Sequence, residues 1–579
     1  MPTPSSPLKE PLRFFGQLPG TRLLKICGLG VAAGLVVVAF HAVVVWLEGH
    51  TMHAWTALPR WEFAGLSFLC VVGGSLLATA LIRWIAPDAA GGGVLPVKLA
   101  FWRDFGLIGT RTAIAKFLGS ALTLGLGVSM GPEGPAIQIG ASAMSGASAR
   151  IGVVKQERRE YCAGGAAAGL AAVFNAPLGA IAFVLEEIIG DLHSRFLGTV
   201  VLGAVMGALV AHALIGPQPA FQVTLQGQPE WIGYVLCPLV AALAAAAGGL
   251  FQRGALRFRG TFRRWRRLPR WSVPALGALG TWICGCLVFF DTGRLGIFGV
   301  GYQDVTAALA GTLSVRASAL LFAGKLAATM LAVGTANCGG IFAPNFFIGA
   351  TCGSTVASLL GYVLPLNPAD EQMLVMVGMC ACLGAVIRTP LACMLLIFEV
   401  TNQFAIVPAL LIATLVSQGV GRLMARHDMY EEQLLQDGIE PHLVLPPRHY
   451  KRWREMPASA LASFKPVTVV TLEPAALRAL LAHSPHARFP VVVDGRVTGM
   501  LGRREAEQAL EQQRAPHLEP ALWVDPKASV ADAQKQLIAS TADMVCVGDE
   551  PSQQLLGVLT LHDLLRGQQA LAEDAPASP

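Results

Sequence analysis

Long apolar stretches separated by short polar breaks fill the chain from about residue 26 to residue 422. From about residue 433 onward these stretches end, and the sequence has the pattern of a soluble domain. The first stretch, 26–47, is about as long as a membrane-spanning helix of roughly 20 residues. A signal peptide has a shorter apolar core and a cleavage site of small residues, so we expect this stretch to be retained. The pattern predicts an all-α polytopic membrane domain followed by a soluble α/β domain.

The same pattern sets the expected domain boundaries. A transmembrane domain over residues 23–435 is predicted to follow a short N-terminal segment, 1–22. A Pro-rich, basic linker over 436–457 then leads to the soluble domain. We expect two similar units and a disordered tail there, and these are residues 458–512, 518–569 and 570–579 in that order.

Composition and charge indicate how the membrane domain is oriented. Charged residues are only 14% of the chain, compared with about a quarter in soluble proteins. The net charge of +6 comes mostly from basic residues beside apolar stretches, and eight arginines crowd into one loop between Arg253 and Arg270. The positive-inside rule puts this loop and the basic N-terminal flank in the cytoplasm. We expect a multi-pass protein of a cell inner membrane with both termini in the cytoplasm. The membrane flanks of the loop argue against nucleic-acid binding by these arginines.

The sequence lacks the common patterns of metal sites and enzymes. Its 12 cysteines are scattered, mostly inside apolar stretches, and their spacing fits no common zinc site. The transmembrane half holds no HExxH, GxSxG or P-loop motif. We therefore expect no metal site and no enzyme, and a membrane-embedded enzyme or receptor is the least favoured class.

Two segments of the membrane domain recur in the same order about 210 residues apart. Residues 112–141 resemble 321–350, and residues 165–187 resemble 378–400, so the repeats span 112–187 and 321–400. The matched pairs include Lys116 with Lys325, Pro135 with Pro344, Gly165 with Gly378, Pro177 with Pro390 and Glu186 with Glu399. Many transporters consist of two such halves with the substrate site where they meet. The sequence leaves open whether the halves are parallel or inverted.

Glycine and proline interrupt the apolar runs at 131–135, 339–344, 175–177 and 388–390. Three glycine-rich breaks, 91–93, 131–135 and 339–344, each precede an expected helix start. A helix that starts inside a membrane presents free N–H groups and the positive end of its dipole, which together bind anions. Alternatively, small residues simply let helices pack tightly. Three such breaks, two of them related by the repeat, favour an ion path.

Several charged residues lie in or beside the apolar runs: Glu133, Glu186, Glu187, Glu399, Lys116 and Lys325. A carboxylate at mid-membrane costs at least about 2.5–3.5 kcal/mol, so a function is its default interpretation. Glu133 lies within a predicted anion-binding turn. When ionised it can occupy the anion site, and when protonated it must leave. We therefore predict that Glu133 is both a gate and a proton carrier. The Glu186–Glu187 pair could also be a solvated helix end, and the two lysines could snorkel or contribute to the field along the anion path.

These motifs resemble the signatures of the CLC family of chloride channels and proton/chloride exchangers. GPEGP at 131–135 is similar to the family's GREGP, and GGIFAP at 339–344 is similar to its GxFxP. AGGGVLPVK at 90–98 stands where GSGIPE is usual, and Tyr430 matches a tyrosine near the family's final helix. The resemblance covers about residues 60–435, and the Ala-, Arg- and Gly-rich usage indicates a bacterial member.

The resemblance implies a homodimer with one pore in each subunit, and two inverted repeats. It implies that the backbone N–H groups of Ile341 and Phe342 and the hydroxyl of Tyr430 bind the anion. Glu133 is similar to the gating glutamate, which also carries the outer proton. Glu187 matches the inner proton-transfer glutamate of the exchangers. Channel members commonly lack a carboxylate there, so its presence favours exchange.

Three positions depart from the family pattern. Gly92 replaces the serine whose hydroxyl helps to hold chloride, Leu95 stands at the usual proline, and Pro132 replaces the arginine before the gating glutamate. Members with proline at the serine position favour nitrate. Glycine at this position matches neither the serine nor the proline members. Backbone donors at Gly92 can still bind an anion, so the resemblance leaves the choice between chloride, nitrate and bromide open.

The soluble domain resembles a pair of CBS domains, which are appended to some CLC proteins and often sense adenine nucleotides. Strands are expected near 467–471, 489–493 and 496–501, then 522–524, 544–547 and 555–559, with helices near 474–483, 503–512, 528–539 and 562–566. Thr560 and Asp563 in the second unit could hold a ribose, while the first unit lacks that pair. The alternative is a dimerisation or stability module without a ligand.

The sequence therefore favours a proton-coupled exchanger of chloride-like anions. Its main competitor is a passive anion channel with the same pore, gated by voltage or pH. Anions and protons are the expected partners, with a lipid bilayer around the protein and no cofactor in the membrane domain.

Overall fold

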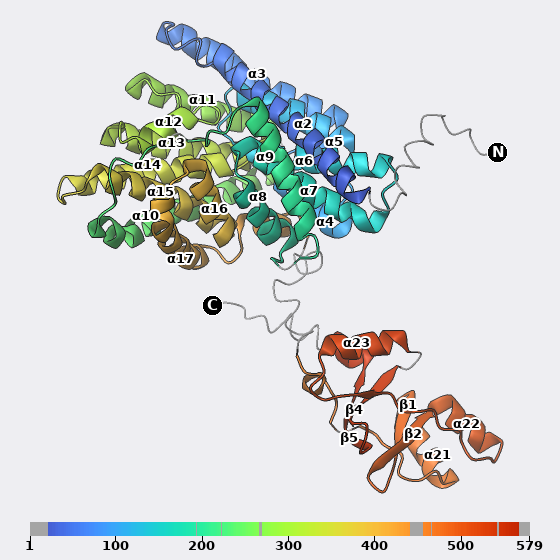
Figure 1. Cartoon of the computed structure of the whole chain (residues 1–579). Coiled ribbons are helices and arrows are strands. Elements are labelled where there is room, and N and C mark those ends of the chain that lie inside the picture. Colours follow the sequence, from blue (N-terminus) through green and yellow to red (C-terminus); the bar gives the residue numbers. More distant parts are fainter. Residues whose placement is uncertain are drawn as a thin grey trace, which may run out of the picture. The chain divides into compact units, whose positions relative to one another are not determined.

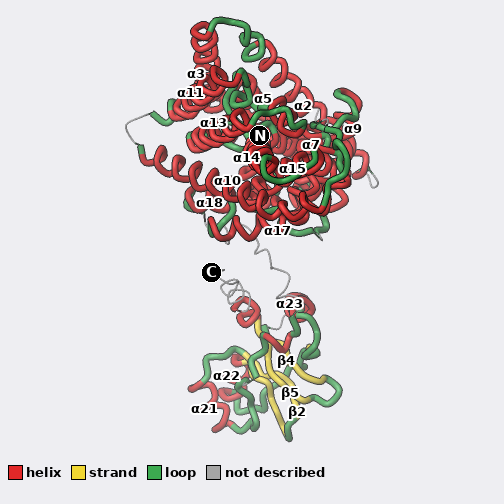
Figure 2. Tube along the Cα trace, turned by 90° about the vertical axis from the view of Figure 1, so that its left-hand side faces the viewer, coloured by secondary structure: helices red, strands yellow, loops and turns green. Residues whose placement is uncertain are grey.

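The computed structural model describes residues 21–439 and 456–566, except 193, 222, 266–268, 465 and 541–542. The chain divides into two compact units, Met1–Val444 and Leu445–Pro579. Figure 2 shows the strands in the second unit, whereas the described part of the first unit consists of helices and loops. The predicted N-terminal segment up to residue 20, most of the predicted linker and the predicted tail 570–579 lie outside the described residues.

The first unit is a bundle of long helices and shorter, broken ones (Figure 1). The apolar stretch predicted at 26–47 lies within its first described helix, α2. Eight helices in the described part are long and apolar enough to cross a membrane, as expected for a multi-pass membrane protein. The helices are α2 Arg22–His50, α3 Arg60–Ile85, α4 Val94–Arg103, α5 Thr110–Gly125, α6 Glu133–Arg150, α7 Lys155–Phe174, α8 Pro177–Phe183, α9 Leu197–Leu214, α10 Trp231–Arg264, α11 Val273–Thr292, α12 Tyr302–Leu309, α13 Val315–Gly334, α14 Phe342–Gly361, α15 Pro368–Ile387, α16 Pro390–Thr401, α17 Val407–Met424 and α18 Met429–Gln436, with 3-10 turns at Pro87–Ala89 and Phe404–Ile406 and a π-turn at Val184–Ile189.

The predicted repeat appears as two matching helix series, α5–α8 and α13–α16. Glycines let the second and third helices of each series cross closely. A Cβ atom on Gly140 would lie 2.3 Å from the carbonyl oxygen of Gly165, and one on Gly349 would lie 2.3 Å from that of Gly378. Only glycine fits at such a distance, so these aligned glycines serve helix packing.

Helix α15 lies beside α10 and α14 (Figure 1). Its 18-residue apolar window is 94% buried, compared with 33% for α3. A helix that is apolar on all sides and buried on all sides needs no polar face. α15 is therefore part of the core, and α10, α14 and α17 pack against it.

The second unit contains two similar α/β parts. Antiparallel strands β1 (Arg488–Val493) and β2 (Arg496–Gly502) form one hairpin, and β4 (Met544–Asp549) and β5 (Gln554–Thr560) form another, with β3 (Trp523–Val524) parallel to β4. Each hairpin has a bulge, at Val491/Val492 and at Val547/Gly548. The helices are the 3-10 turn Ala458–Ala460, α21 Pro474–His483, α22 Arg503–Glu511 and α23 Val530–Ala539, followed by a helical turn at 561–566.

One predicted strand of this unit is wrong. Residues 467–471 form no regular strand, and Val469 alone makes a parallel bridge to Val491. The backbone of Val469 donates to Pro490 and accepts from Val492, at 2.9 and 2.8 Å. Pro466 and Pro474 flank this contact and lack the N–H donor that a longer ladder needs.

Candidate functional site

Three helices begin at the glycine-rich breaks, α4 directly after 91–93 and α6 and α14 within 131–135 and 339–344. α4 begins at Val94, α6 at Glu133 and α14 at Phe342. The breaks touch one another: Gly131 and Gly340 exchange two backbone hydrogen bonds, at 2.9 and 2.6 Å. A Cβ atom on Gly134 would lie 2.0 Å from the carbonyl oxygen of Gly92. The three breaks therefore meet in backbone contact, and the site lies where the two repeats join.

Glu133 is fully buried at the start of α6, and its carboxylate lies at the start of α14. A Cβ atom on Gly131 would be 2.2 Å from Glu133 Oε2, and one on Gly340 would be 3.1 Å from it. The backbone N–H of Ala343, in the first turn of α14, interacts with the same carboxylate. First-turn N–H groups have no partner within their own helix and attract negative charge. Glu133 thus occupies the place where α14 would bind an anion.

The other predicted anion contacts lie around the same point. Ile341 and Phe342 are buried, and the Phe342 ring packs edge-on against Phe183 of α8, with ring centroids 4.9 Å apart. Gly92 is exposed, and a Cβ atom there would meet one atom within 4 Å, the Gly339 carbonyl oxygen at 3.7 Å. The backbone at Gly92 would accept a larger side chain, so glycine is not required by space.

Tyr430 reaches the site from α18, near the end of the membrane domain. Its ring is buried and interacts electrostatically with Glu187 and Glu133. The Asp428 side chain caps α18 by accepting hydrogen bonds from the Tyr430 and Glu431 N–H groups, at 2.9 and 2.8 Å. Arg259 of α10 pairs with Asp437 just after α18, at 2.8 Å. Both contacts fix the helix that carries Tyr430.

Glu187 lies on the π-turn that follows α8, and its side chain is fully buried. Lys98 Nζ of α4 donates to its Oε1 at 2.5 Å, and the Lys98 side chain is 7% exposed. The alternative of a solvated helix end is therefore wrong for Glu187. Sequence reasoning missed Lys98, although a lone lysine in the short apolar helix after the 91–93 break was a signal for a buried partner.

Glu186 and Glu399, which the repeat relates, cap each other's helices. Glu186 accepts hydrogen bonds from the N–H groups of Leu391 and Ala392 at the start of α16, at 3.2 and 2.8 Å. Glu399 accepts from Leu178 and Gly179 at the start of α8, at 2.9 and 2.6 Å. This exchange of equivalent contacts gives both carboxylates a structural role, which corrects their default interpretation as transport residues.

Lys116 and Lys325 are fully buried, so the snorkelling interpretation is wrong. Lys116 Nζ donates to the carbonyl oxygens of Ala89 and Gly91, at 3.1 and 2.5 Å. Lys325 Nζ donates to three carbonyl oxygens, those of Gly296, Gly299 and Val300, at 2.9, 2.8 and 3.3 Å. Each lysine therefore holds the loop before a short helix, α4 in the first half and α12 in the second.

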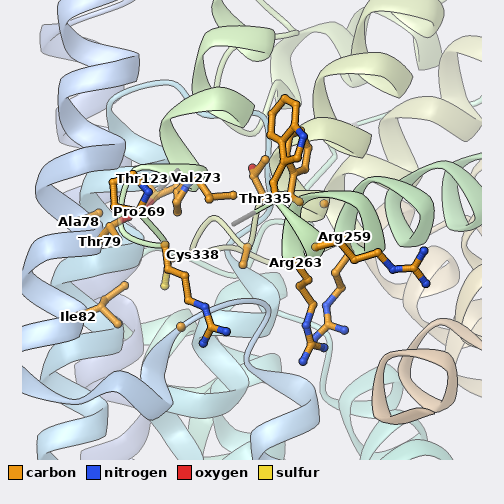
Figure 3. A pocket seen from close by; sticks show the side chains of 18 residues that line it. Ala78, Thr79, Ile82, Thr123, Arg259, Arg263, Pro269, Val273, Thr335 and Cys338 are labelled. Atoms are coloured by element: carbon orange, nitrogen blue, oxygen red, sulfur yellow. The ribbon is translucent and has the colours of Figure 1, made fainter. Parts of the chain in front are cut away.

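A cavity of about 1010 Å³ approaches the breaks from the arginine-rich end of α10. Figure 3 shows Arg259 and Arg263 on one side of it and Ala78 and Ile82 on the other. The cavity reaches Ala90 and Cys338, which directly precede the 91–93 and 339–344 breaks. Arg266 and Arg267 of the same loop lie outside the described residues. No cluster in the described part of the chain could hold a metal ion.

In the second unit, Thr560 and Asp563 bond to each other. Asp563 Oδ2 accepts from the Thr560 N–H and hydroxyl, at 2.9 and 2.6 Å, and the Asp563 N–H donates to Thr560 Oγ1 at 3.2 Å. This is a reciprocal cap on the turn after β5. The pair has a structural role whether or not a ribose binds there.

Comparison with known proteins decides the family. The family model described as voltage gated chloride channel matches residues 74–422. This chain belongs to the voltage-gated chloride channel (CLC) family. The broken helices and the glycine breaks of the first unit are therefore those of a CLC membrane domain, and its two halves are the inverted repeats of that fold.

Curated CLC relatives match most of the membrane domain. An H(+)/Cl(-) exchange transporter, ClcA of Cronobacter sakazakii, is 30% identical over 425 residues, which are 70% of this chain and 88% of the relative. The ClcA transporter of Salmonella arizonae is 28% identical over 414 residues, 69% of this chain and 86% of its own length.

Solved CLC structures share the fold. A slow cyanobacterial Cl-/H+ antiporter superposes with a TM-score of 0.64 at 23% identity, over 73% of this chain and 98% of its own. A eukaryotic CLC transporter superposes with a TM-score of 0.61 at 23% identity, over 93% of this chain and 97% of its own. At 23% identity this likeness establishes the fold of the chain. The ions that the protein moves have to be inferred from the residues of the site.

Proposed function

We propose that this CLC protein exchanges chloride, or a similar anion, for protons across the membrane. The observation that carries the proposal is the position of Glu133, whose buried carboxylate lies at the start of α14 where an anion would bind. The exchange activity named for the ClcA relatives supports coupling to protons rather than passive flow.

The geometry links anion entry to protonation of Glu133. An ionised carboxylate and an anion compete for the same N–H groups at the start of α14, so an anion enters only when Glu133 leaves. A displaced carboxylate that takes up a proton no longer competes, and it releases that proton when it returns. Each cycle then moves anions and protons in opposite directions.

Glu187 would handle protons on the other side of the anion site. Lys98 neutralises its charge inside the protein, because a buried carboxylate without a partner is costly. Lys98 belongs to α4, the helix that starts at the 91–93 break. One short helix therefore joins the proposed inner proton carrier to the anion site.

The membrane setting and assembly belong to the same proposal. We place the protein in a cell inner membrane with both termini in the cytoplasm, which the arginines at the end of α10 support. We propose a homodimer in the lipid bilayer, as the CLC resemblance implies, and a CBS-like role for the second unit. An adenine nucleotide at Thr560 and Asp563 stays a prediction, and the reciprocal cap offers a sufficient reason for both residues.

The test is anion efflux from liposomes that contain the purified protein, with chloride and external pH recorded together. A chloride gradient should drive protons uphill. Glu133→Gln mimics the protonated gate and should abolish proton movement while anions still flow. Glu62→Gln, in the first turn of α3, is a matched control that should behave as the wild type.

A passive channel would give a different result in the same measurement of anion efflux and external pH. Anion efflux without proton movement in the wild-type protein would contradict exchange. Unchanged proton coupling in Glu133→Gln would contradict the role of Glu133.

A further inference from the structure

A second cavity, of about 740 Å³, lies between α2 and the segment from Gly293 to Asp304. We call it the α2–α12 cavity. It adjoins the end of α2 that lies far from Arg22, and exposed glycines at Gly49 and Gly293 line it. The cavity is therefore reached from the side opposite the basic N-terminal flank.

One face of α2 supplies two ionisable side chains to this cavity. His41, Val44, Val45 and Glu48 line it at helical spacing. His41 Nδ1 is buried and forms no hydrogen bond with any described residue. Glu48 Oε1 accepts a hydrogen bond from the Val300 N–H at 3.1 Å. The cavity is large enough to hold water, and a water molecule there can pair with the His41 ring nitrogen.

The facing wall is already paired. Asp304 bonds to Arg294 at 3.1 Å and accepts from the Gly296 N–H at 2.8 Å. These contacts hold the loop before α12. Tyr302, the first residue of α12, follows this loop and faces Glu133.

Tyr302 separates the cavity from Glu133. It is the first residue of α12 and lines the cavity, whereas Glu133 does not. Its hydroxyl donates to Glu133 Oε1 at 3.3 Å. The ring is fixed by edge-on packing against Phe221, with ring centroids 5.3 Å apart. Tyr302 therefore bonds to the Glu133 carboxylate through its hydroxyl and also lines the α2–α12 cavity.

We propose that the Tyr302 hydroxyl relays protons between water in the α2–α12 cavity and Glu133. The inference rests on the proposed exchange of protons for anions. A hydroxyl both donates and accepts hydrogen bonds, so it can take a proton from water as it gives its own to Glu133 Oε1. The O–H bond to the old proton breaks, one to the new proton forms, and Tyr302 is neutral before and after. In the reverse direction the same steps return the proton to water.

The titratable and charged groups around this relay lie on several elements. They are His41 and Glu48 on α2, His53 after α2, Arg294 and Asp304 on the facing wall, Lys325 on α13 and Glu133 on α6. Glu48 and Lys325 interact electrostatically with each other, and Glu48 also interacts with Tyr302.

The test compares Tyr302→Phe in two backgrounds, wild type and Glu133→Gln, in the liposome assay from about pH 7 to about pH 5. Positioned proton transfer accelerates a step about 100-fold or more, so we expect at least a tenfold slower exchange for Tyr302→Phe near pH 7. The deficit should shrink toward pH 5, where free protons reach Glu133 without the relay. In Glu133→Gln, which needs no proton, Tyr302→Phe should leave the anion flux unchanged. Tyr234→Phe on α10 is the matched control, because it removes a hydroxyl that is bonded to the Ala405 carbonyl, and it should leave exchange unchanged.

The outcomes separate this inference from the function on which it rests. Wild-type exchange with an unaffected Tyr302→Phe would overturn the relay alone. An equal loss of anion flux in both backgrounds would show that Tyr302 shapes the pore, and would also overturn it. A wild-type protein that moves no protons would overturn the proposed exchange and the relay together.

Discussion

The two halves of the membrane domain place equivalent residues at equivalent points of the backbone. In the first half Lys116 holds the loop before α4, and in the second Lys325 holds the loop before α12. Glycine pairs bring α6 onto α7 and α14 onto α15 in the same way. The carboxylates at the ends of α8 and α16 cap each other's helices.

The halves differ at the residues that would move ions. In the repeat alignment, Glu133 of the first half stands opposite Phe342 of the second, and Glu187 stands opposite Val400. The first half also supplies Lys98, the partner of Glu187. Residues that both halves share stabilise the fold. The residues proposed to move ions stand at positions where the two halves differ. The comparison therefore predicts which substitutions damage the fold and which damage transport.

The largest expected effect on stability is at the helix crossings. Gly140→Ala and Gly349→Ala each place a methyl group 2.3 Å from a carbonyl oxygen of the next helix. Overpacking of this kind costs about 3 kcal/mol, and both halves should lose the same amount. The measurement is thermal unfolding of the purified protein, in which size-exclusion chromatography gives the folded fraction that remains after heating.

Gly65→Ala is the control for these variants, because a Cβ atom there meets nothing within 4 Å. It should unfold at the wild-type temperature. A large loss of stability in one of the two variants and none in the other would contradict the structural equivalence of the halves.

A smaller and equally symmetric effect is expected at the reciprocal caps. Glu186→Gln and Glu399→Gln keep an oxygen acceptor but lose its charge, so each should reduce the free energy of unfolding by about 1 kcal/mol. The same unfolding measurement compares them. If one variant were neutral and the other severe, the two carboxylates would not be equivalent caps.

The smallest expected effect is on anion choice at Gly92, where the structure has room for a side chain. Gly92→Ser adds a hydroxyl donor near the anion site, and one such hydrogen bond is worth about 1 kcal/mol. We expect about a fivefold rise in the preference for chloride over nitrate in competition flux assays. Gly92→Ala adds the same bulk without the donor and should leave the preference unchanged, so an equal shift in both variants would contradict the explanation.

The sequence could predict the features that depend on one stretch of chain. Clustered glycines and prolines within apolar runs marked the starts of α4, α6 and α14, because such clusters disfavour a continuous helix. The repeat was visible because packing glycines and capping residues must recur in both halves. The strands of both hairpins in the second unit lie close to the predicted ranges 489–493, 496–501, 544–547 and 555–559.

Contacts between distant residues could not be predicted in this way. Lys98 and Glu187 are 89 residues apart, and their pairing depends on how α4 packs against the π-turn after α8. Tyr302 reaches Glu133 across 169 residues and from the opposite half. Glu186 and Glu187 are adjacent in sequence and have similar surroundings there. Only the fold shows that one caps a helix and the other pairs with a lysine.

This adjacent pair gives the most direct test of the central claim, that ion chemistry lies where the halves differ. We would measure chloride-driven proton uptake in liposomes containing Glu186→Gln or Glu187→Gln, with anion efflux recorded in the same vesicles. We expect Glu187→Gln to stop proton movement while anions still flow, and Glu186→Gln to keep coupled exchange despite its lower stability. Proton movement that survives in Glu187→Gln, or is lost in a folded Glu186→Gln, would contradict the claim.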